Sequence, residues 1–335
     1  MIWRRLDRPA LGLANSWSDQ LARLESEQGP VFPDIRGART LIITSDYGGY
    51  HKGARYETIS FLLASLDGCA DWEAKRTSLR MHLLPGGRRM SFKGMNDRHR
   101  RDALASFLDA ANDIPGVLVS FCTSWDLRFA LCRDEEVDRS WDELAPEVLF
   151  SPPSFRRLIR AAAFVSLFLA GLSAPMQDLL WFSDEDDFLA DDRRIRAATN
   201  VFARVTSHYL PHSLRHFRFG STRSDNGSRS IEDLAALPDL AAGTMTEMLT
   251  VAQAPDSLSS FREISQGLFL KSRYIASWIA NASSALKKLT CVLSPGDRTD
   301  SVKTQWLQVE TSPALVQPPS FGTHGFRGSI FGRIP

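Results

Sequence analysis

The sequence predicts an α/β protein: a mixed sheet of three antiparallel strands followed by parallel ones, flanked by helices. Two observations lead to this prediction. Three strand-like stretches, 40–46, 56–66 and 88–94, follow one another without a long helix between them, which indicates an antiparallel meander. From Asp97 onward, helical and strand-like stretches alternate, which is typical of parallel strands added by helical crossovers.

The first predicted strand, 40–46, is a run of β-prone residues that ends in one carboxylate, Asp46. Tyr47 and the pair Gly48-Gly49 follow, which is typical of a tight turn. Open α/β sheets bind their ligands at the carboxyl ends of their strands. Asp46 is therefore a candidate site residue, and the alternative is an aspartate that forms an Asx turn before the glycines.

The first helix after the meander is predicted over 97–112, where apolar residues recur at helical spacing after a capping Asn96 or Asp97. A fourth strand, 117–122, follows Pro115-Gly116, and a helical crossover would make it parallel to an earlier strand. The other predicted elements are helices over 16–27, 154–172, 188–206 and 269–289, a helix that begins near Asp239, and strands over 178–182 and 214–219.

A chain of 335 residues with 43% hydrophobic content is long enough to bury a large core. Its pattern predicts four segments. They are an N-terminal helical extension over 1–39, the α/β domain over 40–252, a helical C-terminal extension that packs on the core over 253–316, and a loose tail over 317–335.

The charges nearly balance, with 40 lysines and arginines against 39 acidic residues, so the net charge does not indicate a polyanionic partner. The basic residues are nevertheless unevenly distributed. One window contains Arg76, Arg80, Arg88, Arg89, Lys93, Arg98, Arg100 and Arg101. Such a window suits nucleic acid, and the alternative is a solvated basic surface.

Two features favour a cytoplasmic protein that does not enter a membrane. The first residues lack the apolar run of a secretory signal, and the longest apolar stretch, 161–174, is shorter than the roughly 20 residues that span a bilayer. The four cysteines show no metal-binding spacing and are expected to be reduced and structural.

The order of these elements resembles the RNase H-like architecture, and more narrowly the uncharacterised bacterial RNase H-like families. Three marks carry the resemblance: Asp46 on the first strand, Phe92-Lys93-Gly94 on a later strand, and the helix start Pro238-Asp239-Leu240-Ala241-Ala242-Gly243. The similarity covers about residues 40–252. It implies that carboxylates from the first strand, a later strand end and a late helix converge in a nuclease site.

The resemblance implies that Asp46, Asp184 and Asp239 hold Mg²⁺ or Mn²⁺, and the fourth ligand is expected to be Glu185 or alternatively Asp187. Clustered carboxylates supply the oxygen ligands that two-metal phosphodiester hydrolysis needs. Alternatives remain for each residue. Asp184 begins a run of four acids that fits a solvated turn, Asp239 fits the first turn of a helix, and Asp233 is a local rival of Asp239.

Basic residues near the predicted site complete the hypothesis. Lys93 would neutralise a phosphate or the carboxylates, or else protect an edge strand from further pairing. His51 and Lys52 would contact the substrate backbone or shuttle a proton, and Arg88 and Arg89 would also bind the substrate. The alternative is that all four are solvated surface residues.

The sequence lacks the motifs of P-loop nucleotide binding, of serine hydrolases with a nucleophile elbow and of zinc proteases. The leading hypothesis is a metal-dependent nuclease acting on DNA or RNA. One rival is a catalytically inactive RNase H-like module that binds nucleic acid or a protein, and another is a phosphoesterase acting on a small substrate. The oligomeric state stays open.

Overall fold

A computed structural model describes residues 1–127, 150–183, 189–252, 268–281, 284–298, 301–307 and 324–325 of the chain. Within these residues, eight strands form one mixed sheet in the order β5-β4-β1-β2-β3-β6-β7-β8. The strands are β1 (Thr40–Gly48), β2 (Tyr56–Ser65), β3 (Gly116–Ser124), β4 (Asp178–Ser183), β5 (His216–Ser221), β6 (Leu286–Pro295), β7 (Ser301–Leu307) and β8 (His324–Gly325).

The sheet combines antiparallel and parallel pairs. Strands β1, β2 and β3 are antiparallel neighbours, while β4 runs parallel to β1 and β5 runs parallel to β4. Strand β6 is parallel to β3, and β7 and β8 continue the sheet as antiparallel neighbours. The prediction of a mixed sheet flanked by helices is therefore confirmed.

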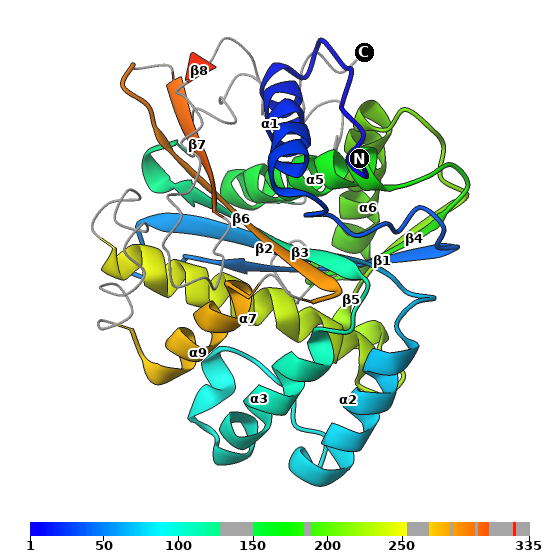
Figure 1. Ribbon diagram of the computed structural model, residues 1–335, viewed down its shortest axis with the longest axis vertical. Coiled ribbons are helices and arrows are strands. Elements are labelled where there is room, and N and C mark those ends of the chain that lie inside the picture. The colour runs from blue at the N-terminus through cyan, green and yellow to red at the C-terminus, as the bar shows by residue number, and fades with distance from the viewer. Residues whose placement is uncertain are drawn as a thin grey trace.

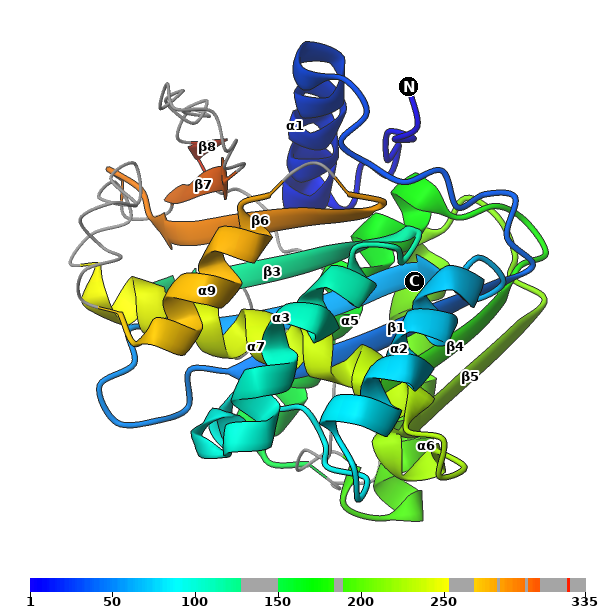
Figure 2. The same cartoon turned by 60° about the horizontal axis from the view of Figure 1, so that its bottom comes forward.

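Helices cover both faces of the sheet, as Figures 1 and 2 show. One face, called the α5 face below, carries α1 (Gly12–Gln28), α5 (Pro152–Leu172) and α6 (Asp192–Tyr209). The opposite face, called the α7 face, carries α2 (Ala70–Leu83), α3 (Arg98–Ala111), α7 (Ser230–Val251) and α9 (Leu270–Ile279). Short 3₁₀ turns are η1 (Lys93–Asn96), η2 (Trp125–Leu127) and η4 (Thr222–Ser224).

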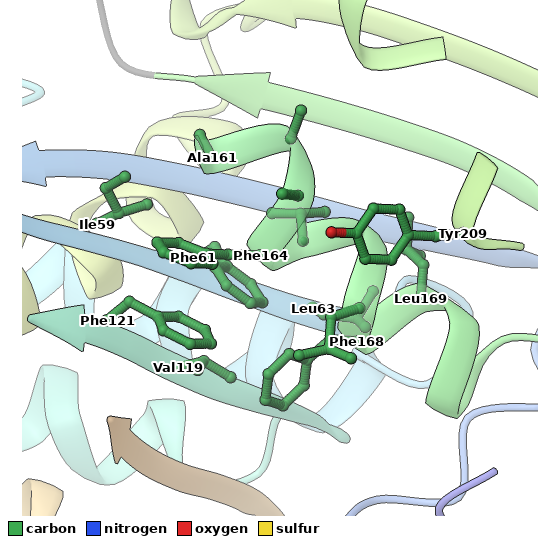
Figure 3. Packing of buried hydrophobic residues seen from close by; sticks show 14 of the residues in the cluster. Ile59, Phe61, Leu63, Val119, Phe121, Ala161, Phe164, Phe168, Leu169 and Tyr209 are labelled. Carbon is green, nitrogen blue, oxygen red and sulfur yellow. The ribbon is translucent and has the colours of Figure 1, made fainter. Parts of the chain in front are cut away.

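The core on the α5 face is rich in aromatic side chains. Because side chains alternate along a strand, Ile59, Phe61 and Leu63 of β2 all point toward α5 (Figure 3). Phe121 of β3 stacks on Phe164 of α5 with ring centroids 4.0 Å apart. This packing explains why α5 is apolar on nearly all sides: it lies between the sheet and the helices α1 and α6.

The predicted third strand over 88–94 is wrong. Helices α2 and α3 are inserted between β2 and β3, and the third strand of the antiparallel set is β3, which pairs antiparallel with β2 and so runs in the same direction as β1. Before η1 the backbone amide of Phe92 donates to the carboxylate of Asp239, at 2.7 Å, and not to a strand partner. Gly86 and Gly87 both have positive φ, so the chain turns just before this stretch.

The predicted helix over 269–289 is also wrong in its second half. Helix α9 ends at Ile279, and the β-prone run Leu289-Thr290-Cys291-Val292-Leu293 lies in β6. In its described residues, the segment 253–316 therefore contains a helix and two strands of the main sheet instead of helices alone. The predicted tail over 317–335 lies outside the described residues apart from the two residues of β8.

No helix in the described part of the chain is both long enough and apolar enough to span a bilayer. Even α5, with its apolar surface, includes the arginines Arg156, Arg157 and Arg160.

Candidate functional site at the carboxyl end of β1

Asp46 lies near the end of β1, on the α7 face of the sheet. Its neighbours at alternate positions show this: the hydroxyl of Thr44 donates to the carbonyl of Leu234 in α7, at 3.0 Å, and Gly48 lies against Thr246 of the same helix. Since side chains two apart share a face, Asp46 points toward α7 between these two contacts. Asp46 is half-buried.

Proline at position 238 explains how α7 is attached to β1. Pro238 lies inside α7 and has no N–H to donate to the carbonyl of Leu234, four residues earlier. The hydroxyl of Thr44 donates to this carbonyl instead. An interior proline normally destabilises a helix by about 3 kcal/mol, and here it leaves an acceptor that β1 satisfies beside Asp46.

The prediction that a helix begins near Asp239 is wrong. Helix α7 begins nine residues earlier, at Ser230. The carboxylate of Asp239 accepts the hydrogen bond from the backbone amide of Phe92. The ring of Phe92 packs against Gly243 one turn later, and the ammonium of Lys271 lies 3.9 Å from the centre of the ring. Asp239 therefore has a structural role in holding the segment before η1 against α7.

Asp184 and Glu185 lie outside the described residues, as do the other two acids of the run, Asp186 and Asp187. The last described residue of β4 is Ser183, and it pairs with Ser45 in the parallel register. Asp46 and Asp184 are the residues that follow this pair in the sequence. In the described part of the chain, no three His, Cys, Asp or Glu side chains gather as a metal-binding group.

A row of small polar side chains crosses the sheet from Asp46. In the register of the strands, Asp46 pairs with Ser60, Ser60 with Ser120, and Ser120 with Thr290. The hydroxyls of Ser60 and Ser120 are 2.7 Å apart, and both residues are buried. Sequence reasoning missed this row, although Ser60, Ser120 and Thr290 are polar residues within largely buried strands.

Lys93 was predicted to lie on a strand, and this is wrong: it is the exposed first residue of η1. Arg88 pairs with Asp97 at 3.5 Å, and Arg89 pairs with Glu232 at the start of α7. His51 and Lys52 are exposed in the turn between β1 and β2. The structure thus places His51 and Lys52 near the carboxyl end of β1, while Arg88 and Arg89 take part in ion pairs within the chain.

Asp233, the rival of Asp239, belongs to a buried ion-pair cluster between α2 and α7. Its carboxylate pairs with Arg76 at 3.1 Å and with Arg80, and the carboxyl group is almost completely buried. Burial raises the pKa of Asp233, while Arg80 and Arg76 act in the opposite direction. Two residues of the predicted basic window are therefore used to anchor α7 to α2.

A second buried charge cluster lies at the same end of the sheet, on the α5 face. Glu57, near the start of β2, is 1% exposed and accepts a hydrogen bond from Nη2 of Arg160 at 2.5 Å. The hydroxyl of Tyr50 also donates to Glu57, and Nε of Arg157 donates to the same hydroxyl at 2.7 Å. Sequence reasoning missed this cluster; its signal was a glutamate in one apolar element and arginines in another.

The cysteines among the described residues support no catalytic thiol. Cys69, Cys122 and Cys291 are buried and unpaired, and burial raises the pKa of both Cys69 and Cys122 to about 12. A thiol with such a pKa holds its proton at neutral pH and is a poor nucleophile. Cys132 lies outside the described residues.

No protein-family model, curated protein or solved structure matches the chain. The functional assignment therefore depends on the residues of this site.

Proposed function

We propose that the chain is an RNase H-like, metal-dependent nuclease that hydrolyses phosphodiester bonds in DNA or RNA. The observation that carries the proposal is the position of Asp46. It is half-buried near the carboxyl end of an interior strand, and the neighbouring parallel strand is described as far as Ser183, directly before the acids 184–187. The three antiparallel strands with parallel strands beside β1 are in keeping with an RNase H-like sheet.

The donor chemistry fits Mg²⁺ or Mn²⁺ only in part. Carboxylate oxygens are the ligands that Mg²⁺ prefers, and Asp46 and Asp239 lie on elements that contact each other. Further ligands would have to come from Asp184 and Glu185. When bound, a divalent ion would activate water and stabilise the charge that develops at the leaving oxygen. His51 and Lys52 are exposed near this end of β1 and would contact the phosphate backbone of the substrate.

A catalytically inactive binding module is the second candidate, and the contact of Asp239 favours it. The carboxylate of Asp239 accepts the backbone N–H of Phe92, which is a sufficient structural reason for an aspartate at this position. In that case α7 contributes packing, and any nucleic acid or protein partner would bind without being cleaved.

Asp46→Asn tests the proposal, with Asp109→Asn at an exposed position of α3 as the matched control. The amide keeps the shape of the carboxylate and removes the charge that would hold a cation. Loss of a ligand should reduce cleavage at least about 100-fold, since even residues that support metal ligands typically contribute 10–100-fold. Asp109→Asn should cleave like the wild type.

The measurement is Mg²⁺- or Mn²⁺-dependent cleavage of single-stranded, duplex and hybrid substrates, together with thermal unfolding with and without the metal. Asp46→Asn should also lose the rise in melting temperature that the metal causes in the wild type. A wild-type chain that cleaves no substrate and melts no higher with metal would favour the binding module. Cleavage that persists in Asp46→Asn would place the site elsewhere.

A further inference from the structure

We propose that the buried guanidinium of Arg160 is the centre of a binding site for a phosphate group, located beside the turn between β1 and β2. The proposal does not rest on nuclease activity. It concerns residues on the α5 face of the sheet, whereas Asp46 lies on the α7 face.

Arg160 has buried hydrogen-bond donors that the described part of the protein does not use. The residue is 3% exposed and lies on the third turn of α5, and its Nη2 donates to Glu57. Its Nε and Nη1 are buried and have no hydrogen-bond partner among the described residues. Buried donors are nearly always satisfied, so two unsatisfied N–H positions on one guanidinium indicate a missing acceptor.

Glu57 has little capacity left to supply that acceptor. Its Oε2 accepts from Arg160, and its Oε1 accepts from the hydroxyl of Tyr50 and lies 3.9 Å from Nε of Arg157. One carboxylate is thus shared by two guanidiniums and a phenol. An oxyanion that meets the remaining N–H groups of Arg160 would complete the planar fork of donors with which arginine binds phosphate.

Tyr50 connects the buried cluster with the surface. Tyr50 is 44% exposed, and the centre of its ring lies 3.7 Å from the guanidinium carbon of Arg157. Its ring and that of Trp125 form a T-shaped pair. The turn that carries Tyr50 also has three exposed basic residues, His51, Lys52 and Arg55. The positive charges of Lys52 and Arg55 favour a phosphate over a neutral ligand, and movement of Tyr50 would give it access to Arg160.

The test is thermal unfolding of the full chain against inorganic phosphate, with ionic strength held constant by NaCl and with acetate as a carboxylate control. A ligand that binds only the folded state raises the melting temperature with its concentration. Phosphate should raise the melting temperature of the wild type more than acetate does.

Arg160→Lys keeps the positive charge and removes the planar fork. It should weaken phosphate binding at least about tenfold, because hydrogen bonds to charged groups are the strong ones. The matched control is Arg215→Lys, since Arg215 is likewise a hydrogen-bonded partner of a carboxylate, that of Asp178 in β4, at a distance from the turn between β1 and β2. The control should bind phosphate like the wild type.

If Arg160→Lys does not fold, Glu57→Gln tests whether Arg160 binds phosphate. Removing the carboxylate takes away the anion that competes for Arg160, so phosphate should bind more tightly than to the wild type. If the Arg160–Glu57 pair only clamps α5 to β2, Glu57→Gln should lower stability and leave the response to phosphate unchanged. No phosphate response in the wild type, or an equal response in Arg160→Lys, overturns the proposal.

A competition arm identifies the source of the phosphate group. If phosphate raises the apparent Kd of a single-stranded oligonucleotide, the site binds the nucleic-acid backbone; if there is no competition, it binds free phosphate or a small phosphorylated compound. Asp46→Asn should keep the phosphate response. Failure of the nuclease proposal and failure of this site are therefore seen in different measurements.

Discussion

Gly49 turns the chain out of β1 with a backbone that other residues adopt only under strain. Its φ is +89°, and a Cβ atom built on it would lie 2.0 Å from the carbonyl oxygen of Tyr56. The neighbouring turn residue Gly53 also has positive φ, of +94°, but no atom of the described residues lies near its Cβ direction. Alanine at Gly53 would therefore add backbone strain alone, whereas alanine at Gly49 would add both backbone strain and a steric clash.

Gly49→Ala should destabilise the fold by clearly more than Gly53→Ala. Positive φ alone costs a non-glycine residue about 1–3 kcal/mol, so Gly53→Ala should stay within that range. Gly49→Ala adds a clash with backbone, which cannot rotate away. The free energy of unfolding from urea titration measures both. Equal losses would mean that the turn relaxes around the added methyl group and that the contact with Tyr56 is unimportant.

At the scale of elements, α7 is held to β1 by an unusual exchange of hydrogen-bond partners. The carbonyl of Leu234 has no helical donor, because Pro238 lacks an N–H, and it accepts a hydrogen bond from the hydroxyl of Thr44 instead. Both groups are buried, so neither has water as an alternative. The contact determines how α7 lies over the strand that carries Asp46.

A double-mutant cycle of Thr44→Val and Pro238→Ala tests this contact. Thr44→Val leaves the Leu234 carbonyl without a donor and should cost about 1–3 kcal/mol of unfolding free energy. In the Pro238→Ala background the new N–H of residue 238 can donate to that carbonyl, so the same change should cost less. The measurement is urea unfolding of the four proteins. Equal costs in the two backgrounds would contradict the proposed exchange.

At the scale of the whole molecule, the N-terminal residues contact parts of the chain that are distant in sequence. Trp3 packs on Gly171 at the end of α5, and Nη1 of Arg4 lies 3.3 Å from Nδ1 of His212. The other ring nitrogen of His212 is 3.0 Å from the hydroxyl of Ser173. His208 is partly buried in the last turn of α6, and the nearby charge of Arg8 acts on it.

The two histidines should make global stability depend on pH. Burial first, and then Arg4, lowers the pKa of His212 below its usual 6.5, and burial and Arg8 lower the pKa of His208 in the same way. The unfolded chain therefore binds protons at a higher pH than the folded chain. Stability should be full above about pH 6.5 and fall as the pH decreases toward the folded-state values.

Urea midpoints at pH 7.5, 6.5 and 5.5 measure this dependence. Replacing both histidines, as His208→Gln with His212→Gln, should flatten the decrease between pH 6.5 and 5.5, because glutamine does not titrate. A decrease of unchanged size in the double variant would assign the pH dependence to other groups.

The sequence by itself determined the elements whose pattern is local. Runs of β-prone residues placed β1, β2 and β4, helical spacing placed α3 and a long apolar run placed α5, all close to their observed bounds, because each of these patterns lies within the element's own residues. The position of Asp46 at the end of β1 followed from the same pattern. Which strand pairs with which, and in what direction, depends on residues far apart in the chain.

Only the tertiary structure decided the third strand, the C-terminal strands and the partners of the site residues. The stretch before η1 looks β-prone, yet Phe92 pairs with the side chain of Asp239, 147 residues away. Thr44 and Leu234 are 190 residues apart, and Arg160 and Glu57 are 103 apart. No local period records such contacts, because a hydrogen bond between distant residues adds one polar side chain to each element and leaves its hydrophobic pattern unchanged.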